Sequence, residues 1–176
     1  MKILIEPIYS KKPLSLFELG CTIIESDQAT IYLHPAFEKQ DVFRGVSKQE
    51  VLDHELVHYH RRHFEGDRYE ESLAFFRSKS RLRRYFGAAI RTPKEGKIFL
   101  MVTFFFWGLF IFFPFNLWIF LSYAFFGSFF FLRSALTYLK LKALVLFLDS
   151  KSENNGFDAL IQMDEKSIDD LLKSIR

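Results

Sequence analysis

The sequence is poor in cysteine and nearly balanced in charge, and each of these shortages excludes a class of protein. Cys21 is the single cysteine among 176 residues, which excludes an intrachain disulfide and a cysteine-rich zinc ribbon. The formal net charge of +3 is too small to indicate nucleic-acid binding, and the sequence carries no RNA- or DNA-binding motif. We therefore expect no nucleic-acid partner.

One long segment lacks acidic and basic side chains altogether. From Ile98 to Leu132 there is no Asp, Glu, Lys, Arg or His, and fourteen of the 23 Phe lie in this segment. A single membrane-spanning helix needs only about 20 apolar residues, and the turn signal Pro114-Phe115-Asn116 divides the run in two. The sequence therefore predicts a transmembrane helical hairpin. The alternatives are one long kinked segment or two buried helices in a soluble oligomer.

Basic residues flank this apolar run on both sides. Lys94 and Lys97 precede it, and Arg133 and Lys140 follow it. Because positively charged flanks stay in the cytoplasm, we expect an integral, two-pass membrane protein with both termini and the domain before the hairpin in the cytoplasm. The lipid bilayer is then a partner, and eight basic residues between positions 77 and 97 favour anionic head groups. Whether the hairpins associate into oligomers stays open.

The rest of the sequence predicts the α+β class. We expect a small domain over residues 1–96, the hairpin over residues 97–139 and a C-terminal segment over residues 140–176. Alternation of apolar residues predicts strands and helical periodicity predicts helices, while Pro35 indicates that the strand at 29–37 either ends there or lies at an edge. The expected elements are strands at 1–9 and 29–37, helices from Ser15, at 47–64 and at 68–85, a linker at 91–96, and an amphipathic helix at 164–175.

An HExxH motif, His54-Glu55-Leu56-Val57-His58, lies inside the helix expected to begin at the capping box Ser47–Glu50. Residues four apart lie on the same face of a helix, so the imidazoles of His54 and His58 can bind one Zn²⁺. Glu55 can reach a water molecule on that metal, act as general base and pass the proton to the leaving amine. The motif indicates a zinc metallopeptidase in which Glu55 is catalytic.

This motif, followed by a glutamate on the next helix, resembles the gluzincin class of zinc metallopeptidases. In that class the third ligand is a Glu on the helix after the motif, commonly with a small residue three positions later. Glu71-Ser72-Leu73-Ala74 matches that pattern, so the resemblance implies Glu71 as third zinc ligand, with Glu70 as its rival, and a small zincin-like domain. The resemblance covers residues 29–85. The added membrane segment is distantly similar to the CAAX-type and heat-shock membrane metallopeptidases.

The sequence departs from the class at two points. Twelve residues separate His58 from Glu71, which is a short gap. Many gluzincins follow the small residue with an Asp that supports a ligand His, and this sequence has Phe75 there, so the support must come from elsewhere. The donor to a developing oxyanion is also left open. The candidates are Tyr59, Tyr69, Tyr85 and Arg77.

Two functional hypotheses follow from these residues. The first is a membrane-anchored zinc endopeptidase that hydrolyses peptide bonds with a zinc-activated water. Its substrate is a membrane-proximal peptide or protein that pairs with the strand at 29–37. The alternative is a non-catalytic membrane adaptor whose metal is absent or structural. A structural site tends to have four protein ligands, and His34 is an open candidate for the fourth.

The acidic C-terminal segment suggests a possible form of regulation. Asp164–Asp170 could lie over the basic residues 77–97 and keep the enzyme latent, because the two segments have opposite charge. In that case truncation after Leu148 would raise activity.

Overall fold

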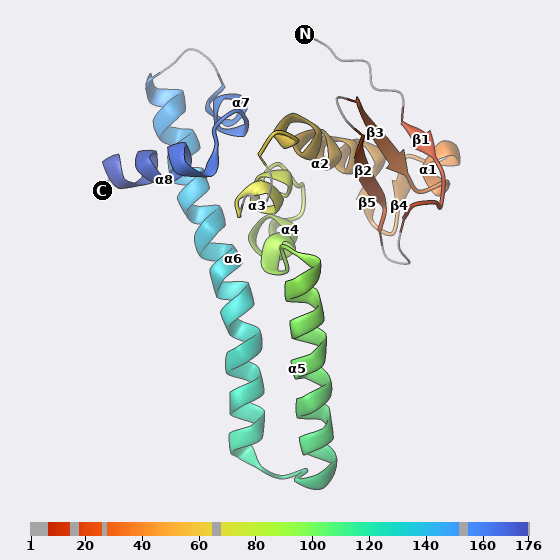
Figure 1. Ribbon diagram of the computed structural model, residues 1–176, viewed down its shortest axis with the longest axis vertical. Helices are drawn as coiled ribbons and strands as arrows, with labels where there is room; N and C mark the ends of the chain where they lie inside the picture. Colours follow the sequence, from red (N-terminus) through yellow and green to blue (C-terminus); the bar gives the residue numbers. More distant parts are fainter. Residues whose placement is uncertain (1–6, 15–17, 26–27, 65–67, 152–154, 176) are drawn as a thin grey trace.

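The computed structural model describes residues 7–14, 18–25, 28–64, 68–151 and 155–175. The chain is α+β, as expected, and predominantly helical (Figure 1). The strands are β1 (Ile8–Tyr9), β2 (Gly20–Glu25), β3 (Gln28–Leu33), β4 (Val42–Phe43) and β5 (Val46–Ser47). The helices are α1 (Ala36–Lys39), α2 (Lys48–Arg61), α3 (Glu70–Ala74), α4 (Arg81–Phe86), α5 (Pro93–Phe112), α6 (Leu117–Lys151), α7 (Gly156–Ile161) and α8 (Glu165–Ser174), with a 3-10 turn at Gly87–Ala89.

The main sheet has the strand order β1-β3-β2. β3 pairs in parallel with β1 and antiparallel with β2, so that Tyr32 lies opposite both Ile8 and Cys21. Of the two alternatives that Pro35 left open, the end of the strand is confirmed, because β3 ends at Leu33. The edge position is wrong, because both sides of β3 are occupied. The helix expected from Ser15 is also wrong in its described part, which is strand β2. Its β-branched residues favour a strand once β3 lies beside it. Residues 1–6 and 15–17 lie outside the described residues.

Helix α2 begins as the capping signal predicts. The Ser47 hydroxyl accepts a hydrogen bond from the backbone N–H of Glu50 at 3.2 Å. The carboxylate of Glu50 does not complete the capping box, because it accepts hydrogen bonds from Arg83 at 3.0 Å and from Ser78. The single helix expected at 68–85 is instead two short helices, α3 and α4. The hydroxyl of Ser80 caps the second of them, which is why the chain begins a new helix there.

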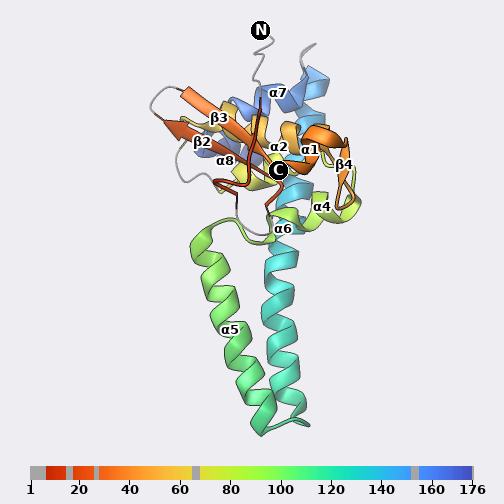
Figure 2. The same cartoon turned by 90° about the vertical axis from the view of Figure 1, so that its right-hand side faces the viewer.

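Helices α5 and α6 run side by side away from the rest of the molecule (Figures 1 and 2). The turn between them falls where Pro114-Phe115-Asn116 predicts it, and Asn116 Oδ1 accepts from the backbone N–H of Trp118 at 3.0 Å. The expected linker is partly helical, because the Thr92 side chain caps α5. α6 continues to Lys151, well past the expected end of the apolar segment.

Both helices are long and apolar enough to cross a membrane, by length and composition. The candidate spans are Lys94–Phe112 and Leu117–Lys151. We call residues 93–132 the hairpin and the other described residues the head. Large side chains of the hairpin face outward, and Phe112 is 78% exposed and Trp118 77%. An ion pair between Arg133 and Glu95, at 2.7 Å, joins the two helices where they enter the head.

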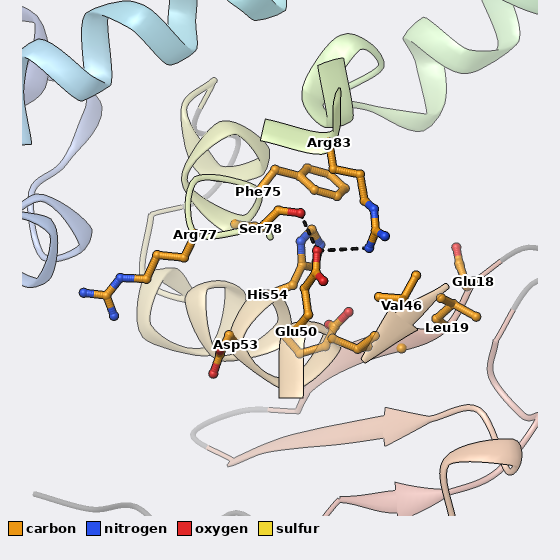
Figure 3. A pocket seen from close by; sticks show the side chains of 14 residues that line it. Glu18, Leu19, Val46, Glu50, Asp53, His54, Phe75, Arg77, Ser78 and Arg83 are labelled. Carbon is orange, nitrogen blue, oxygen red and sulfur yellow. Dashed lines mark hydrogen bonds and ion pairs between the residues drawn. The ribbon is translucent and has the colours of Figure 1, made fainter. Parts of the chain in front are cut away.

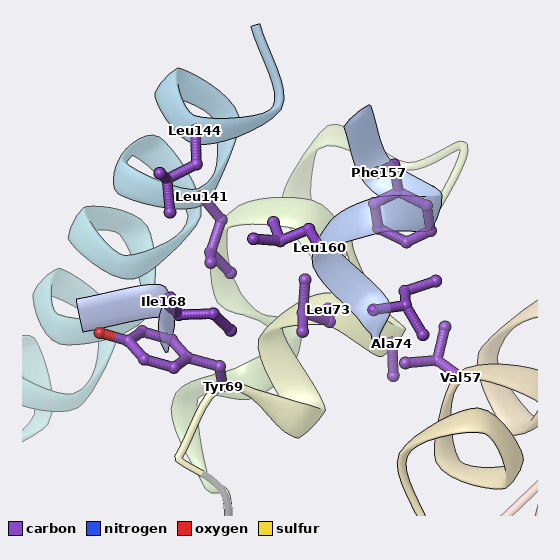
Figure 4. Close-up of a cluster of buried hydrophobic side chains, with 10 residues drawn as sticks. Val57, Tyr69, Leu73, Ala74, Leu141, Leu144, Phe157, Leu160 and Ile168 are labelled. Atoms are coloured by element: carbon purple, nitrogen blue, oxygen red, sulfur yellow. The ribbon is translucent and has the colours of Figure 1, made fainter. Parts of the chain in front are cut away.

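The head has a core to which distant parts of the sequence contribute (Figure 4). The second half of α6 packs against α3, α7 and α8. The buried side chains of this cluster are Val57, Tyr69, Leu73, Ala74, Leu141, Leu144, Phe157, Leu160, Ile161 and Ile168. Buried Arg61 at the end of α2 donates to the carbonyls of Leu160, Ile161 and Met163, at 3.3, 2.8 and 3.0 Å. Residues of both 1–96 and 140–176 therefore contribute to this core, and a second buried cluster lies within the first of these segments.

Candidate metal centre

Three side chains from α2 and α3 converge on one point. The Nε2 atoms of His54 and His58 are 3.2 Å apart. Glu71 Oε1 lies 3.7 Å from His58 Nε2, and Glu71 Oε2 lies 4.0 Å from His54 Nε2. Donors of a tetrahedral zinc ion with bonds of 2.0–2.1 Å lie about 3.4 Å apart. This cluster could therefore hold a metal ion with little movement of the side chains.

Glu70, the rival to Glu71, contacts the other side of the cluster. Its Oε1 lies 2.8 Å from Nδ1 of His58. A carboxylate on the second ring nitrogen fixes the orientation of a ligand imidazole, so Glu70 is positioned to direct Nε2 of His58 toward the other two ligands. Burial lowers the pKa of His58, but the Glu70 hydrogen bond and the charge of Glu71 raise it by more, and the net shift is upward. The adjacency of two glutamates is the one feature of the sequence that could have indicated this support.

His54 is supported differently. Burial and repulsion from His58 lower its pKa to about 3, although a hydrogen bond with the backbone of Ala74 opposes the shift. His54 is therefore neutral, which is the form of imidazole that binds metals. Phe75 packs its ring edge-on against His54 with centroids 4.4 Å apart. The orientation of His54 thus depends on a backbone group and an aromatic ring.

Glu55 is buried between α2 and β2, with 4% of its surface exposed. The Thr22 hydroxyl on β2 donates to Glu55 Oε2 at 2.8 Å. Burial raises the pKa of Glu55, and the nearby His58 and the Thr22 hydrogen bond reduce that rise. Gly20 gives the carboxylate room, because a Cβ there would lie 3.1 Å from Glu55 Oε1 and 2.6 Å from Val51 Cγ1. Thr22 and Gly20 are far from the motif in the sequence and lie beside it only because β2 packs against α2, so the sequence alone does not identify them.

A cavity of about 250 Å³ opens beside His54 and Glu55. Its wall contains Glu50, Ser78 and Arg83, which form a hydrogen-bonded group next to the His54 ring (Figure 3). Arg83 also donates to the carbonyl of Gly45 at 3.0 Å, so its guanidinium is held in place. The apolar part of the wall consists of Leu19, Val46, Val51, Ala74 and Phe75.

The candidate oxyanion donors lie elsewhere. Arg77 lines the cavity, but its guanidinium points away from His54 (Figure 3) and pairs with Asp158 at 3.3 Å. Tyr69 donates to Asp169 at 2.6 Å. The ring of Tyr85 packs against Tyr138, and Arg62 lies over the ring of Tyr59. Arg83, by contrast, lines the cavity and its side chain is directed at it (Figure 3).

The C-terminal helices do not cover this cavity. Of the described residues that line it, none belongs to 155–175. Their acidic side chains pair at the margin of the head, where Glu165 contacts Arg68 at 3.1 Å and Asp158 contacts Arg77. The expectation of an acidic cover over the site is therefore wrong for the part of the chain that the structure describes.

Comparison with protein-family models, with curated proteins and with solved structures gives no match to this chain. The donor set itself indicates what the site can do. Two imidazoles and one carboxylate leave a position open for water or substrate, whereas structural zinc sites are closed by four protein ligands. Among the described His, Cys, Asp and Glu residues, only these three form such a group. His34 is not in it, because its Nδ1 accepts from the backbone N–H of Ala36 and its ring stacks on Phe43.

Proposed function

We propose that the chain is a membrane-anchored, zinc-dependent endopeptidase of the gluzincin type, with a small zincin-like head. One observation carries the proposal. Three metal-binding side chains meet beside Glu55, a buried carboxylate that is not among the donors. Burying a carboxylate is costly, and a purely structural metal site would not need it. His54, His58 and Glu71 would hold the zinc ion.

The residues around the ion have separate tasks. When bound, zinc lowers the pKa of a coordinated water toward about 7 and polarises the carbonyl that is attacked. Glu55 would take the proton of the attacking water and pass it to the leaving amine, and a raised pKa suits a group that must both accept and release a proton. Thr22 holds Oε2 of that carboxylate, which leaves Oε1 for the proton. Glu70 and the backbone of Ala74 would keep the two imidazoles in orientation.

The cavity and β2 support a peptide as substrate. β2 pairs with β3 on one side and packs near α2, so an extended peptide could add to the other side of β2 by backbone hydrogen bonds. This strand takes the place of the one expected at 29–37. The apolar wall around Val51 and Phe75 would then accept an apolar side chain. Anchoring by the hairpin favours membrane-proximal peptides, with the head in the cytoplasm.

A peptide-cleavage assay with one matched variant tests this function. The full chain, purified in detergent, is incubated with a peptide library, stripped of metal by a chelator and then reloaded with zinc. The matched variant is Glu55→Gln, which keeps the size of the side chain and all three metal donors. We expect zinc-dependent cleavage by the wild type and a loss of about 10²–10⁴-fold in the variant, with zinc content unchanged. Equal cleavage by both forms would contradict the role of Glu55 as general base, and bound zinc without cleavage would favour the non-catalytic adaptor.

A further inference from the structure

A second cavity, of about 720 Å³, lies between α6, α8 and the segment that leads into α5. Five cations line it together with one carboxylate, that of Asp169. The cations are Arg68, Arg91, Arg133, Lys140 and Lys173. We propose that this cavity binds the phosphate head group of an anionic phospholipid. The inference goes beyond the peptidase proposal and rests only on its membrane-anchoring part.

Three of these cations already have acidic partners. Arg133 pairs with Glu95, Arg68 with Glu165 and Asp169, and Lys173 with Asp170. Carboxylates of the protein largely neutralise their charges. These three cations therefore line the cavity but are not the main groups that would bind a phosphate.

Arg91 and Lys140 differ from the other three. Neither makes an ion pair with any residue in the described ranges. Arg91 Nη2 donates to the hydroxyl of Thr137 at 2.8 Å, while its Nε is buried without a hydrogen-bond partner. Thr137 and Lys140 are three residues apart on α6 and lie on the same face. Two cations without an acidic partner among the described residues thus meet in one cavity, and the Nε of one of them, Arg91, has no hydrogen-bond partner. A phosphate would pair with both Arg91 and Lys140.

The depth of the cavity matches that of lipid head groups. At 1.5 Å per residue, Arg133 lies about 24 Å and Lys140 about 35 Å along α6 from Leu117. A bilayer has an apolar core of about 30 Å, and of 40–45 Å with its head groups. Lys140 is then at head-group level when the turn of the hairpin lies at the opposite surface. Leu172 and Ile175 add an apolar wall. Such a wall can contact the start of an acyl chain, whereas a free phosphate ion would gain nothing from it.

Native mass spectrometry of the full chain in detergent tests the proposal. Phosphatidylglycerol and phosphatidylcholine are titrated separately, and inorganic phosphate is added as competitor. The cavity variant is Arg91→Gln with Lys140→Gln. Its control is Lys94→Gln with Lys142→Gln, which removes the same charge from the same two segments at exposed positions that do not line the cavity. Zinc content and thermal melting check that each variant is folded.

We expect the wild type to prefer phosphatidylglycerol and the cavity variant to lose about 30-fold in affinity for it. The control should stay within about threefold of the wild type, because its exposed charges lie outside the cavity and are screened by salt. Equal losses in both variants, or no preference in the wild type, would overturn the proposal. Displacement of the lipid by an equal concentration of inorganic phosphate would assign the cavity to free phosphate. If the double variant does not fold, Lys140→Gln alone is used, because Lys140 is exposed and its substitution should leave the fold intact. This single variant should still weaken binding, because Lys140 lines the cavity.

Flotation with phosphatidylcholine vesicles separates this inference from the anchoring proposal. A chain that floats with neutral vesicles but shows no lipid preference would contradict the head-group site alone. A chain that does not float would contradict membrane insertion itself.

Discussion

The head and the hairpin depart from the usual pattern of a water-soluble protein in opposite ways. The head buries charged side chains, and Glu55 and Arg61 are 4% and 1% exposed. The hairpin exposes aromatic ones, and Phe115 is 99% exposed. Buried charges require polar partners, which Thr22 and the carbonyls at the end of α7 supply. Exposed aromatic side chains require apolar surroundings. The head thus encloses polar groups, whereas the hairpin presents the apolar surface that a membrane-spanning segment would need.

Helix α6 belongs to both regions. From Leu117 to Leu132 it has no acidic or basic residue, whereas Leu141 and Leu144 in its second half are fully buried against the C-terminal helices. Arg133, paired with Glu95, marks the change. One helix therefore provides matched positions in both regions, and substitutions at these positions test whether the two regions differ as described.

Truncation after Leu148 should break the head and spare the hairpin. It removes Phe157, Leu160, Ile161 and Ile168 from the core of the head. Loss of one such side chain costs about 2–5 kcal/mol, and a whole domain is stable by only about 5–15 kcal/mol. We expect a chain that still inserts into vesicles but binds no zinc and is rapidly degraded in limited proteolysis. A truncated chain that is folded and more active would restore the latent-enzyme hypothesis.

Single leucine substitutions on α6 compare the contribution of one side chain to stability in the head and in the hairpin. Leu144→Ala removes a fully buried side chain of the head, and Leu132→Ala removes one that is 60% exposed on the hairpin. We expect the first to lower the free energy of unfolding of the head by about 2–5 kcal/mol and the second to change it by about 0.5 kcal/mol or less. Denaturation followed by circular dichroism measures both. Equal losses would mean that the hairpin and the head form one packing unit.

Glu70→Gln tests whether the polar interior of the head serves a metal. The variant keeps the size of the side chain but loses the charge that faces His58 Nδ1. Loss of such a partner typically weakens metal binding by 10–100-fold, and we expect that range in a zinc titration with a competing chelator. Glu38→Gln, on α1 and exposed, is the control. A Glu70→Gln chain with unchanged zinc affinity would show that this contact does not orient the imidazole.

The features that could be predicted from the sequence are those that local patterns determine. The start of α2, the two apolar helices and their turn follow from capping residues, the absence of charge and a proline signal. The meeting of His54, His58 and Glu71 follows from helical spacing together with the resemblance to the gluzincins. Their roles as ligands, and that of Glu55 as general base, stay predictions.

Contacts between distant segments could not be predicted. The support of Glu55 by Thr22 and Gly20 exists only because β2 packs beside α2. The pairing of β3 on both sides depends on β1, and the break between α3 and α4 coincides with the contact from Ser78 to Glu50. Each of these contacts is set by tertiary structure, which a single sequence does not reveal by periodicity.

The most direct test of the account is the zinc content of the full chain in detergent, beside Glu71→Ala and Glu70→Ala. The account predicts about one zinc per chain in the wild type, loss of the metal in Glu71→Ala, and zinc that is retained but more weakly held in Glu70→Ala. A wild type that binds no zinc even when the metal is added, or a Glu71→Ala chain that keeps it with wild-type affinity, would contradict the proposed metal centre.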